Sequence, residues 1–159
     1  MYQVNDYIVY KRNVCKIVDI KDNNNLKYYV LCPLDDSSLK IQIPINTSIV
    51  RPIITEEEMV KLLKIMPSVS TIDVDDKLIE IEYKKLMASD DILDLVKIIK
   101  TTYLKNQERL SKNRKVRDKD VYYFNKAERC LYNEFSLVLN KNYDETKNYV
   151  IKEIENSLT

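Results

Sequence analysis

The stretch RPIITEEE, residues 51–58, separates two parts of the chain that have different character. Thr55 and Glu58 have the spacing of a capping box, in which the threonine caps a helix and the glutamate reaches back to the cap. Before this stretch come short β-branched and aromatic runs, and after it apolar residues recur at helical spacing. The stretch therefore predicts a β domain followed by a helical domain.

The part before Pro52 predicts four or five short strands, including residues 7–10, 14–20, 28–31 and 39–43, with polar turns between them. Residues 40–43 alternate polar and apolar, so Lys40 and Gln42 should point outward together from a half-exposed strand. The chain has no glycine, and asparagine is then the residue best able to supply positive φ at the turns. These features predict a small, strongly bent antiparallel sheet or barrel.

The part after Thr55 predicts helices over residues 55–66, 76–88, 90–112, 118–140 and 144–158. The fourth carries an apolar stripe at three- and four-residue steps, made of Val121, Phe124, Ala127, Leu131, Phe135 and Val138. The fold class is therefore α+β, a small antiparallel sheet followed by an all-α bundle. We place the domains at residues 1–52 and 55–159.

The composition removes most enzyme chemistry. The 159 residues include no histidine, no glycine and three scattered cysteines, Cys15, Cys32 and Cys130. Without histidine there is no Ser-His or Cys-His pair, and without glycine there is no Gly-rich phosphate loop. The composition does not exclude enzymes that use carboxylates alone. Asp73, Asp75 and Asp76, however, lack the other residues of a calcium loop, and we interpret them as caps and solvated turns. We expect no enzyme activity, metal, cofactor or small-molecule substrate.

The charge is unevenly distributed although the net charge is only +1. Residues 55–95 contain eleven acids and five bases, whereas residues 96–132 contain eleven bases and four acids. The chain should therefore present one basic surface, with a run of bases from Lys97 to Lys119. No signal peptide and no apolar run of membrane-spanning length is present, so we expect a cytoplasmic protein with no membrane partner.

Several segments, in this order along the chain, resemble the CarD family of bacterial transcription regulators. They are Val4–Tyr10, Val14–Ile17, Tyr28–Leu31 and Leu39–Pro44 in the β part, and Gln107–Arg109 and Ala127–Phe135 in the helical part. The resemblance implies that the β domain is Tudor-like and binds the RNA polymerase β subunit. It also implies that the helical domain contacts promoter DNA at the upstream edge of the open complex, which would place the protein at the nucleoid.

The chain departs from the family pattern at functional positions. Well-known members insert a tryptophan into the minor groove, whereas this chain has no tryptophan and has Asp73–Lys77 at the matching stretch. The characteristic glycines are replaced by Asn5 and Asn13, and an arginine is replaced near Gln42. These departures favour an alternative, a polymerase-tethered adaptor that recruits another protein without a DNA wedge.

The candidate site residues follow from the charge pattern and the resemblance. Phosphate contact is predicted for Lys84, Lys85, Lys105, Arg109, Lys112, Arg114, Lys115, Arg117 and Lys119. Polymerase contact is predicted for Lys40 and Gln42. A solvated helix face and an ordinary exposed strand are the simpler interpretations of the two sets. The tyrosines of the helical part, Tyr103, Tyr122, Tyr123 and Tyr132, are expected in the core rather than stacked on bases.

The function predicted from the sequence is modulation of transcription initiation through the stability of the open complex. The alternatives are the adaptor described above and, from a different class, a carboxylate-dependent metal hydrolase.

Overall fold

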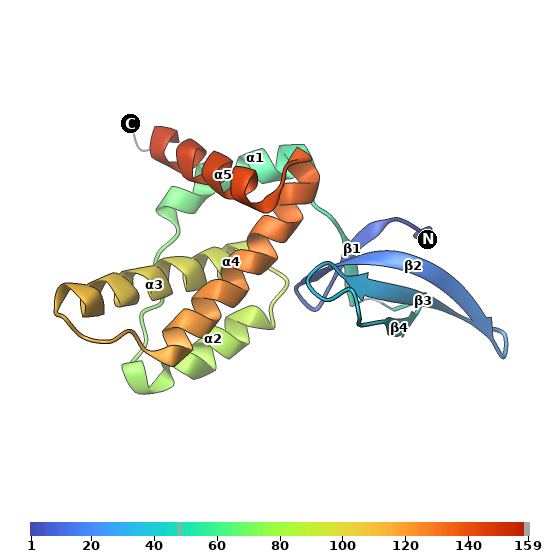
Figure 1. Cartoon of the computed structure of the whole chain (residues 1–159), viewed down its shortest axis with the longest axis horizontal. Coiled ribbons are helices and arrows are strands. Elements are labelled where there is room, and N and C mark those ends of the chain that lie inside the picture. The colour runs from blue at the N-terminus through green and yellow to red at the C-terminus, as the bar shows by residue number, and fades with distance from the viewer. Residues whose placement is uncertain (48, 158–159) are drawn as a thin grey trace. The chain divides into compact units, whose positions relative to one another are not determined.

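The computed structural model describes residues 1–47 and 49–157 (Figure 1). The chain divides into two compact units, Met1–Ile54 and Thr55–Thr159. The first consists of strands and the second of helices, which confirms the α+β class and the order of the two parts. The predicted end of the last helix at Leu158 lies outside the described residues.

The β unit is a single antiparallel sheet with the strand order β4-β3-β2-β1-β5. Its described strands are β1 (Tyr7–Tyr10), β2 (Asn13–Asn23), β3 (Leu26–Pro33), β4 (Ile41–Pro44) and β5 (Val50–Pro52). The first four follow one another as neighbours, and β5 returns to pair with β1. The register of β2 against β3 shifts between Ile17 and Asp19, a bulge that bends the long hairpin visible in Figure 1.

One face of this sheet forms its core. The buried side chains that form this core cluster are Ile8, Cys15, Ile17, Tyr29, Leu31 and Ile43. They come as register partners, with Ile8 opposite Cys15 and Ile17 opposite Leu31, so apolar pairs cross the sheet on one side. The hydroxyl of Tyr29 accepts a hydrogen bond of 3.0 Å from the backbone N–H of Tyr2, which satisfies its polar end.

The turns of the sheet use positive φ without glycine. Asn24 and Asn25 have φ of 53° and 66° in the two-residue β2–β3 turn, as predicted for asparagine. At the β1–β2 turn the prediction that asparagine supplies positive φ is wrong, because Lys11 and Arg12 take φ of 46° and 72° while Asn13 already belongs to β2. A two-residue turn of this handedness requires positive φ at both positions, whatever residues occupy them.

The helical unit contains η1 and η2, two short 3₁₀ turns, and five described α-helices. The bounds are α1 (Glu56–Ile65), η1 (Met66–Ser68), η2 (Asp76–Leu78), α2 (Ile79–Met87), α3 (Ile92–Ser111), α4 (Asp118–Leu139) and α5 (Tyr143–Ser157). The predicted capping box is confirmed, since Thr55 accepts from the Glu58 N–H and Glu58 accepts from the Thr55 N–H. Asp91 caps α3 through the Leu93 N–H.

Helix α4 lies against α3 and α2, but its buried face differs from the predicted stripe (Figure 1). Ala127, Leu131 and Phe135 are buried as predicted. Val121, Phe124 and Val138 are only half-buried, and their places in the core are taken by Tyr123, Cys130, Tyr132 and two acids, Asp120 and Glu134. The prediction considered only apolar residues, and the buried face of α4 that it gave is therefore shifted by about one residue from the observed face.

Candidate nucleic-acid interface

The turn between α3 and α4 holds the densest part of the predicted basic run. Asn113, two residues after the end of α3, lies in the left-handed region at φ 56°, and the Arg114 N–H donates to the Arg109 carbonyl at 2.8 Å. The Asn113 N–H donates to the Leu110 carbonyl, which completes a Schellman motif with asparagine in the glycine position. The Arg109 side chain then bridges the turn, with Nε donating to the Lys115 carbonyl at 2.8 Å.

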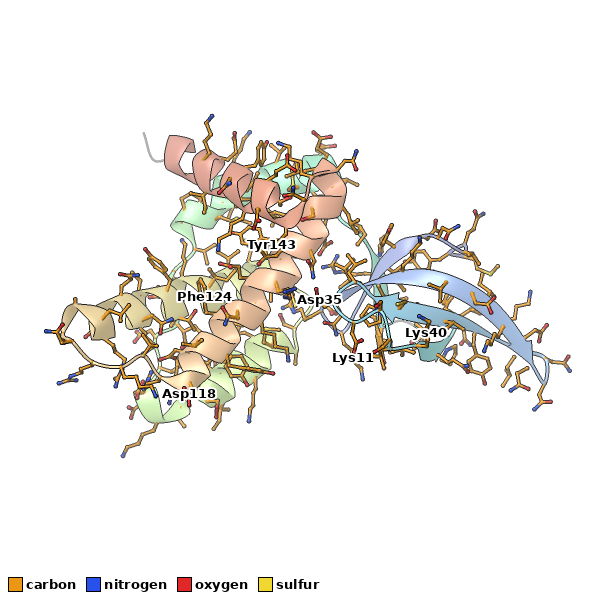
Figure 2. All side chains as sticks on the ribbon, viewed as in Figure 1. Lys11, Asp35, Lys40, Asp118, Phe124 and Tyr143 are labelled. Atoms are coloured by element: carbon orange, nitrogen blue, oxygen red, sulfur yellow. The ribbon has the colours of Figure 1, made fainter. Side chains whose placement is uncertain are left out.

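Beside this turn is a hollow of about 180 Å³, here called the basic hollow. It is lined by Asp76, Lys105, Glu108, Arg109, Lys112, Arg114 and Arg117. Five bases and two acids give its lining a formal charge of +3. Residues from η2, from α3 and from the connection to α4 meet here, and Asp118 in Figure 2 marks the start of α4. A concave surface with this excess of positive charge attracts anions.

Within the basic hollow, Arg117 and Lys105 bind the carboxylate of Asp76. Nη1 of Arg117 lies 2.6 Å from Oδ2 of Asp76, and Nζ of Lys105 lies 3.5 Å from Oδ1. The hydrogen bond from Arg117 is the main cause that lowers the pKa of Asp76 to about 2. Asp76 is half-exposed, but the prediction that it is a cap is wrong, because Asp75 holds the cap position of η2 and the Asp76 carboxylate pairs with two bases far away in the sequence.

A buried acid fixes the other side of Arg117. Asp120 is fully buried, and its Oδ2 accepts from Nε of Arg117 at 2.8 Å while its Oδ1 accepts from the Tyr83 hydroxyl at 2.9 Å. Burial and the bond to Asp120 raise the pKa of Tyr83, so its hydroxyl stays protonated and donating. Arg117 was predicted to contact phosphate, but its side chain donates hydrogen bonds to two carboxylates of the protein itself, those of Asp76 and Asp120.

The remaining bases of the turn are arranged differently. Lys112 pairs with Glu108 at 3.0 Å across one helical turn, and both side chains are exposed, so this pair is weak. Arg114 and Lys115 are exposed, and no ion pair of their side chains occurs within the described part of the chain. Lys119 is half-buried, and its charge helps to lower the pKa of Asp76. Arg114 and Lys115 are therefore the bases best placed to meet an external phosphate.

The other predicted bases lie outside the basic hollow. Lys84 and Lys85 are exposed in the last turn of α2. Lys97, at the start of the basic run, pairs with Asp94 at 3.7 Å. Lys100 donates to the carbonyls of Pro67 and Val69 at 3.1 and 2.7 Å. Lys100 therefore holds η1 and the residue that follows it against α3.

In the β unit, the two predicted polymerase contacts occupy different settings. Gln42 is exposed on β4, which is an edge of the sheet. Strand β4 begins at Ile41, so Lys40 precedes the strand and the prediction that both residues share it is wrong. The Lys40 ammonium, labelled in Figure 2, donates to the Ser37 carbonyl at 3.2 Å and lies 3.4 Å from the Cys32 sulfur. The Lys40 ammonium is thus bound by the loop before β4 and by the end of β3.

The tyrosines of the helical unit divide into two groups. Tyr123 and Tyr132 are buried, as predicted. Tyr103 and Tyr122 are more than half exposed, so the core prediction is wrong for them. The Lys126 ammonium lies 5.6 Å from the centre of the Tyr122 ring, a cation–π contact on the surface of α4.

No protein-family model matches the chain, and no curated protein matches it. None of the helices in the described ranges is long and apolar enough to cross a membrane. In the same ranges, no three Asp, Glu, Cys or His side chains come together in a way that could hold a metal ion.

The sequence prediction missed two residues of the site, Tyr83 and Asp120. Arg117 and Asp120 stand three residues apart at a helix start, a spacing that allows a salt bridge, and this signal was available in the sequence. Tyr83 and Asp120 are 37 residues apart, and nothing local connects them. Only the packing of α2 against α4 brings them together.

Proposed function

We propose that the chain is a transcription-initiation factor of the CarD type, whose β unit binds the RNA polymerase β subunit and whose helical unit contacts promoter DNA at the upstream edge of the open complex. Such a factor stabilises the open complex to the extent that it binds this state better than the closed one. The observation that carries the proposal is the basic hollow with the exposed pair Arg114 and Lys115 beside it. The ordered resemblance of the sequence segments supplies the choice of partner.

The basic surface supports phosphate contact rather than base readout. Arg114 and Lys115 sit on a turn that is held by the Schellman motif and by the Arg109 bridge, so their backbone positions are fixed before any ligand binds. Contacts to phosphate position a protein on DNA, whereas sequence is read at base edges in the grooves. We therefore expect binding that depends little on promoter sequence.

The position of β4 at an edge of the described sheet supports docking of a partner strand. The Ile45 N–H donates to the Lys27 carbonyl, so these two residues form a hydrogen-bonded pair. Hydrogen-bonded and non-hydrogen-bonded pairs alternate along an antiparallel ladder. The next hydrogen-bonded pair is therefore Tyr29 with Ile43, and Val30 with Gln42 is a non-hydrogen-bonded pair. The backbone N–H of Gln42 consequently points away from β3. It is available to a strand added at this edge, a recurring mode of peptide recognition.

The DNA part of the proposal is tested by filter binding of the full chain to forked promoter DNA. Replacing Arg114 and Lys115 together by Ala should weaken binding by a similar factor on unrelated promoters. Arg117 is left unchanged because its loss would leave Asp120 buried without its ion-pair partner. The matched control is Lys61→Ala with Lys64→Ala, which removes the same charge from exposed positions of α1. Equal losses in both variants would contradict the proposal.

The polymerase part is tested by pull-down of RNA polymerase with the full chain. Gln42→Pro removes the outward N–H of β4 without removing a donor of the β3–β4 ladder, and it should reduce capture. Gln42→Ala keeps the N–H and serves as the control. If the two variants capture the same amount of polymerase as the unchanged chain, β4 is not the docking edge.

A second candidate function is the polymerase-tethered adaptor. Leu78, the last residue of η2, and Ile81, in the first turn of α2, are 53% and 64% exposed, and a partner protein would cover these two large apolar side chains. The adaptor would recruit another protein through the helical unit. The adaptor becomes the preferred function if two results are obtained. The chain does not bind forked DNA, and the double replacement Leu78→Ser with Ile81→Ser abolishes capture of another protein by the polymerase-bound chain.

A further inference from the structure

The carboxylate of Asp76 occupies the basic hollow in the manner of a bound anion. One of its oxygens accepts from the guanidinium of Arg117 and the other faces the ammonium of Lys105. Guanidinium and ammonium groups bind phosphate oxygens with the same geometry that they use for carboxylates. Asp76 is thus an internal substitute for an oxyanion at two of the five bases of the hollow.

The positive charge of the lining exceeds the negative charge that Asp76 supplies. With Asp76 and Glu108 included, the lining still carries a formal +3, and the Arg114 side chain is exposed at its edge. Asp76 is itself 55% exposed and belongs to η2, a single 3₁₀ turn preceded by an irregular segment. Its carboxylate can therefore move aside without unpacking a helix, and Asp120 would still hold Arg117 in place.

We propose that the basic hollow binds one phosphate-type oxyanion, of the charge and size of pyrophosphate, and that Asp76 competes with this ligand for Arg117 and Lys105. A hollow of about 180 Å³ has the space of several water molecules, which suffices for such a group. The ligand would be either a free polyphosphate or a phosphate of a nucleic acid. The proposal deepens the proposed function, since the same bases would contact DNA.

The competition predicts the direction in which loss of the Asp76 charge changes the affinity for the ligand, and a basic patch without such competition does not predict it. Removing the negative charge of Asp76 frees two bases and raises the local positive charge. Asp76→Asn should therefore bind pyrophosphate about three to ten times more tightly than the unchanged chain. The control is Glu57→Gln, which makes the same change of charge and of side-chain type at an exposed residue of α1 that pairs with Lys61.

The experiment is isothermal titration of the full chain with pyrophosphate at low ionic strength, with far-UV circular dichroism to confirm that each variant is folded. Arg114→Ala changes an exposed side chain and should lower the affinity severalfold, so the test does not depend on the folding of the Asp76 variant alone. The proposal is overturned if pyrophosphate does not bind, or if Asp76→Asn and Glu57→Gln change its affinity equally.

Further arms separate the two sources of phosphate and the two proposals. Orthophosphate, a nucleoside triphosphate and a short DNA duplex are titrated in parallel, and pyrophosphate is used to displace labelled duplex. Binding of pyrophosphate without binding of duplex supports the hollow as a polyphosphate site and rejects the DNA part of the proposed function. Binding of duplex that pyrophosphate does not displace, and that Asp76→Asn does not strengthen beyond the control, supports DNA contact elsewhere and rejects this inference.

Discussion

The hydroxyl of Tyr83 on α2 donates a hydrogen bond of 2.9 Å to Oδ1 of Asp120 on α4, and both residues are fully buried. The other oxygen of Asp120 accepts from Arg117, so the buried carboxylate has a partner on each side. A charge buried in this way is stable only while its partners are present. The Tyr83–Asp120 contact thereby holds Arg117 beside the basic hollow.

Replacing Tyr83 by Phe should test this arrangement directly. The ring remains in the core, but one oxygen of Asp120 loses its donor, and hydrogen bonds to charged groups contribute about 1.5–3 kcal/mol. We expect the free energy of unfolding to fall by about that amount in urea titrations followed by far-UV circular dichroism, which reports on the helical unit. Tyr103→Phe, at a half-exposed site, is the control and should change little. Equal stability of the two variants would contradict a supporting role for the Tyr83 hydroxyl.

The ion pair of Asp76 should be visible in the acid stability of the chain. Its pKa is lowered from an ordinary value of 3.8 to about 2, mainly by the hydrogen bond from Arg117. A lowered pKa means that the folded state favours the ionised form, so the contribution is complete above pH 3.8 and is lost as the pH falls toward 2. At a half-exposed site it amounts to at most about 1 kcal/mol.

Asp76→Asn should accordingly lose less stability than the unchanged chain between pH 5 and pH 2, by about that amount. Chemical unfolding at a series of pH values, followed by circular dichroism, measures the difference. Parallel pH profiles for the two proteins would show that Asp76 is not ionised preferentially in the folded state.

The β1–β2 turn offers a stabilising substitution. Lys11 has φ 46°, and a residue with a branched or long side chain is disfavoured there by about 1 kcal/mol relative to glycine or asparagine. Lys11→Asn should relieve part of this cost, although it removes a cation–π contact of the ammonium with Tyr10 at 5.3 Å. We expect a net gain of about 0.5 kcal/mol in the β unit, measured as slower amide exchange at Ile8 and Ile17. Lys21→Asn, in β2, should give no gain.

The sequence predicted those features that local chemistry determines. The capping box at Thr55 and the asparagines of the β2–β3 turn follow from rules that span a few residues, and both are present. The same rules failed at Lys11 and Arg12, because the twist of the β1–β2 hairpin imposed positive φ on residues that do not favour it.

The site was predicted less completely, since it depends on packing. The sequence showed where the bases lie along the chain, but it could not show that the Asp76 carboxylate pairs with Arg117, 41 residues later. It also counted Lys100 among the bases of the predicted surface, whereas the Lys100 ammonium donates to two carbonyl groups, those of Pro67 in η1 and of Val69. Charge counts describe composition, and the pairing of charges is a property of the fold.

The last prediction concerns the salt dependence of DNA binding. Each phosphate contact that is lost should flatten the log–log slope of affinity against salt by up to about one unit. Arg114→Ala with Lys115→Ala should therefore flatten it by up to about two units. Lys84→Ala with Lys85→Ala should flatten the slope less. These two lysines lie outside the basic hollow, so the positive charge of the hollow does not hold a phosphate near them.

The measurement is a salt titration of the full chain and both variants on plain and forked duplexes of the same sequence. Because the chain has no tryptophan to insert into the groove, the forked duplex should bind only slightly better than the plain one. The control pair on α1, Lys61 and Lys64 replaced by Ala, should leave the slope unchanged. If that control flattens the slope as much as the Arg114 and Lys115 variant, the chain binds DNA through its overall charge, and the adaptor becomes the better account of its function.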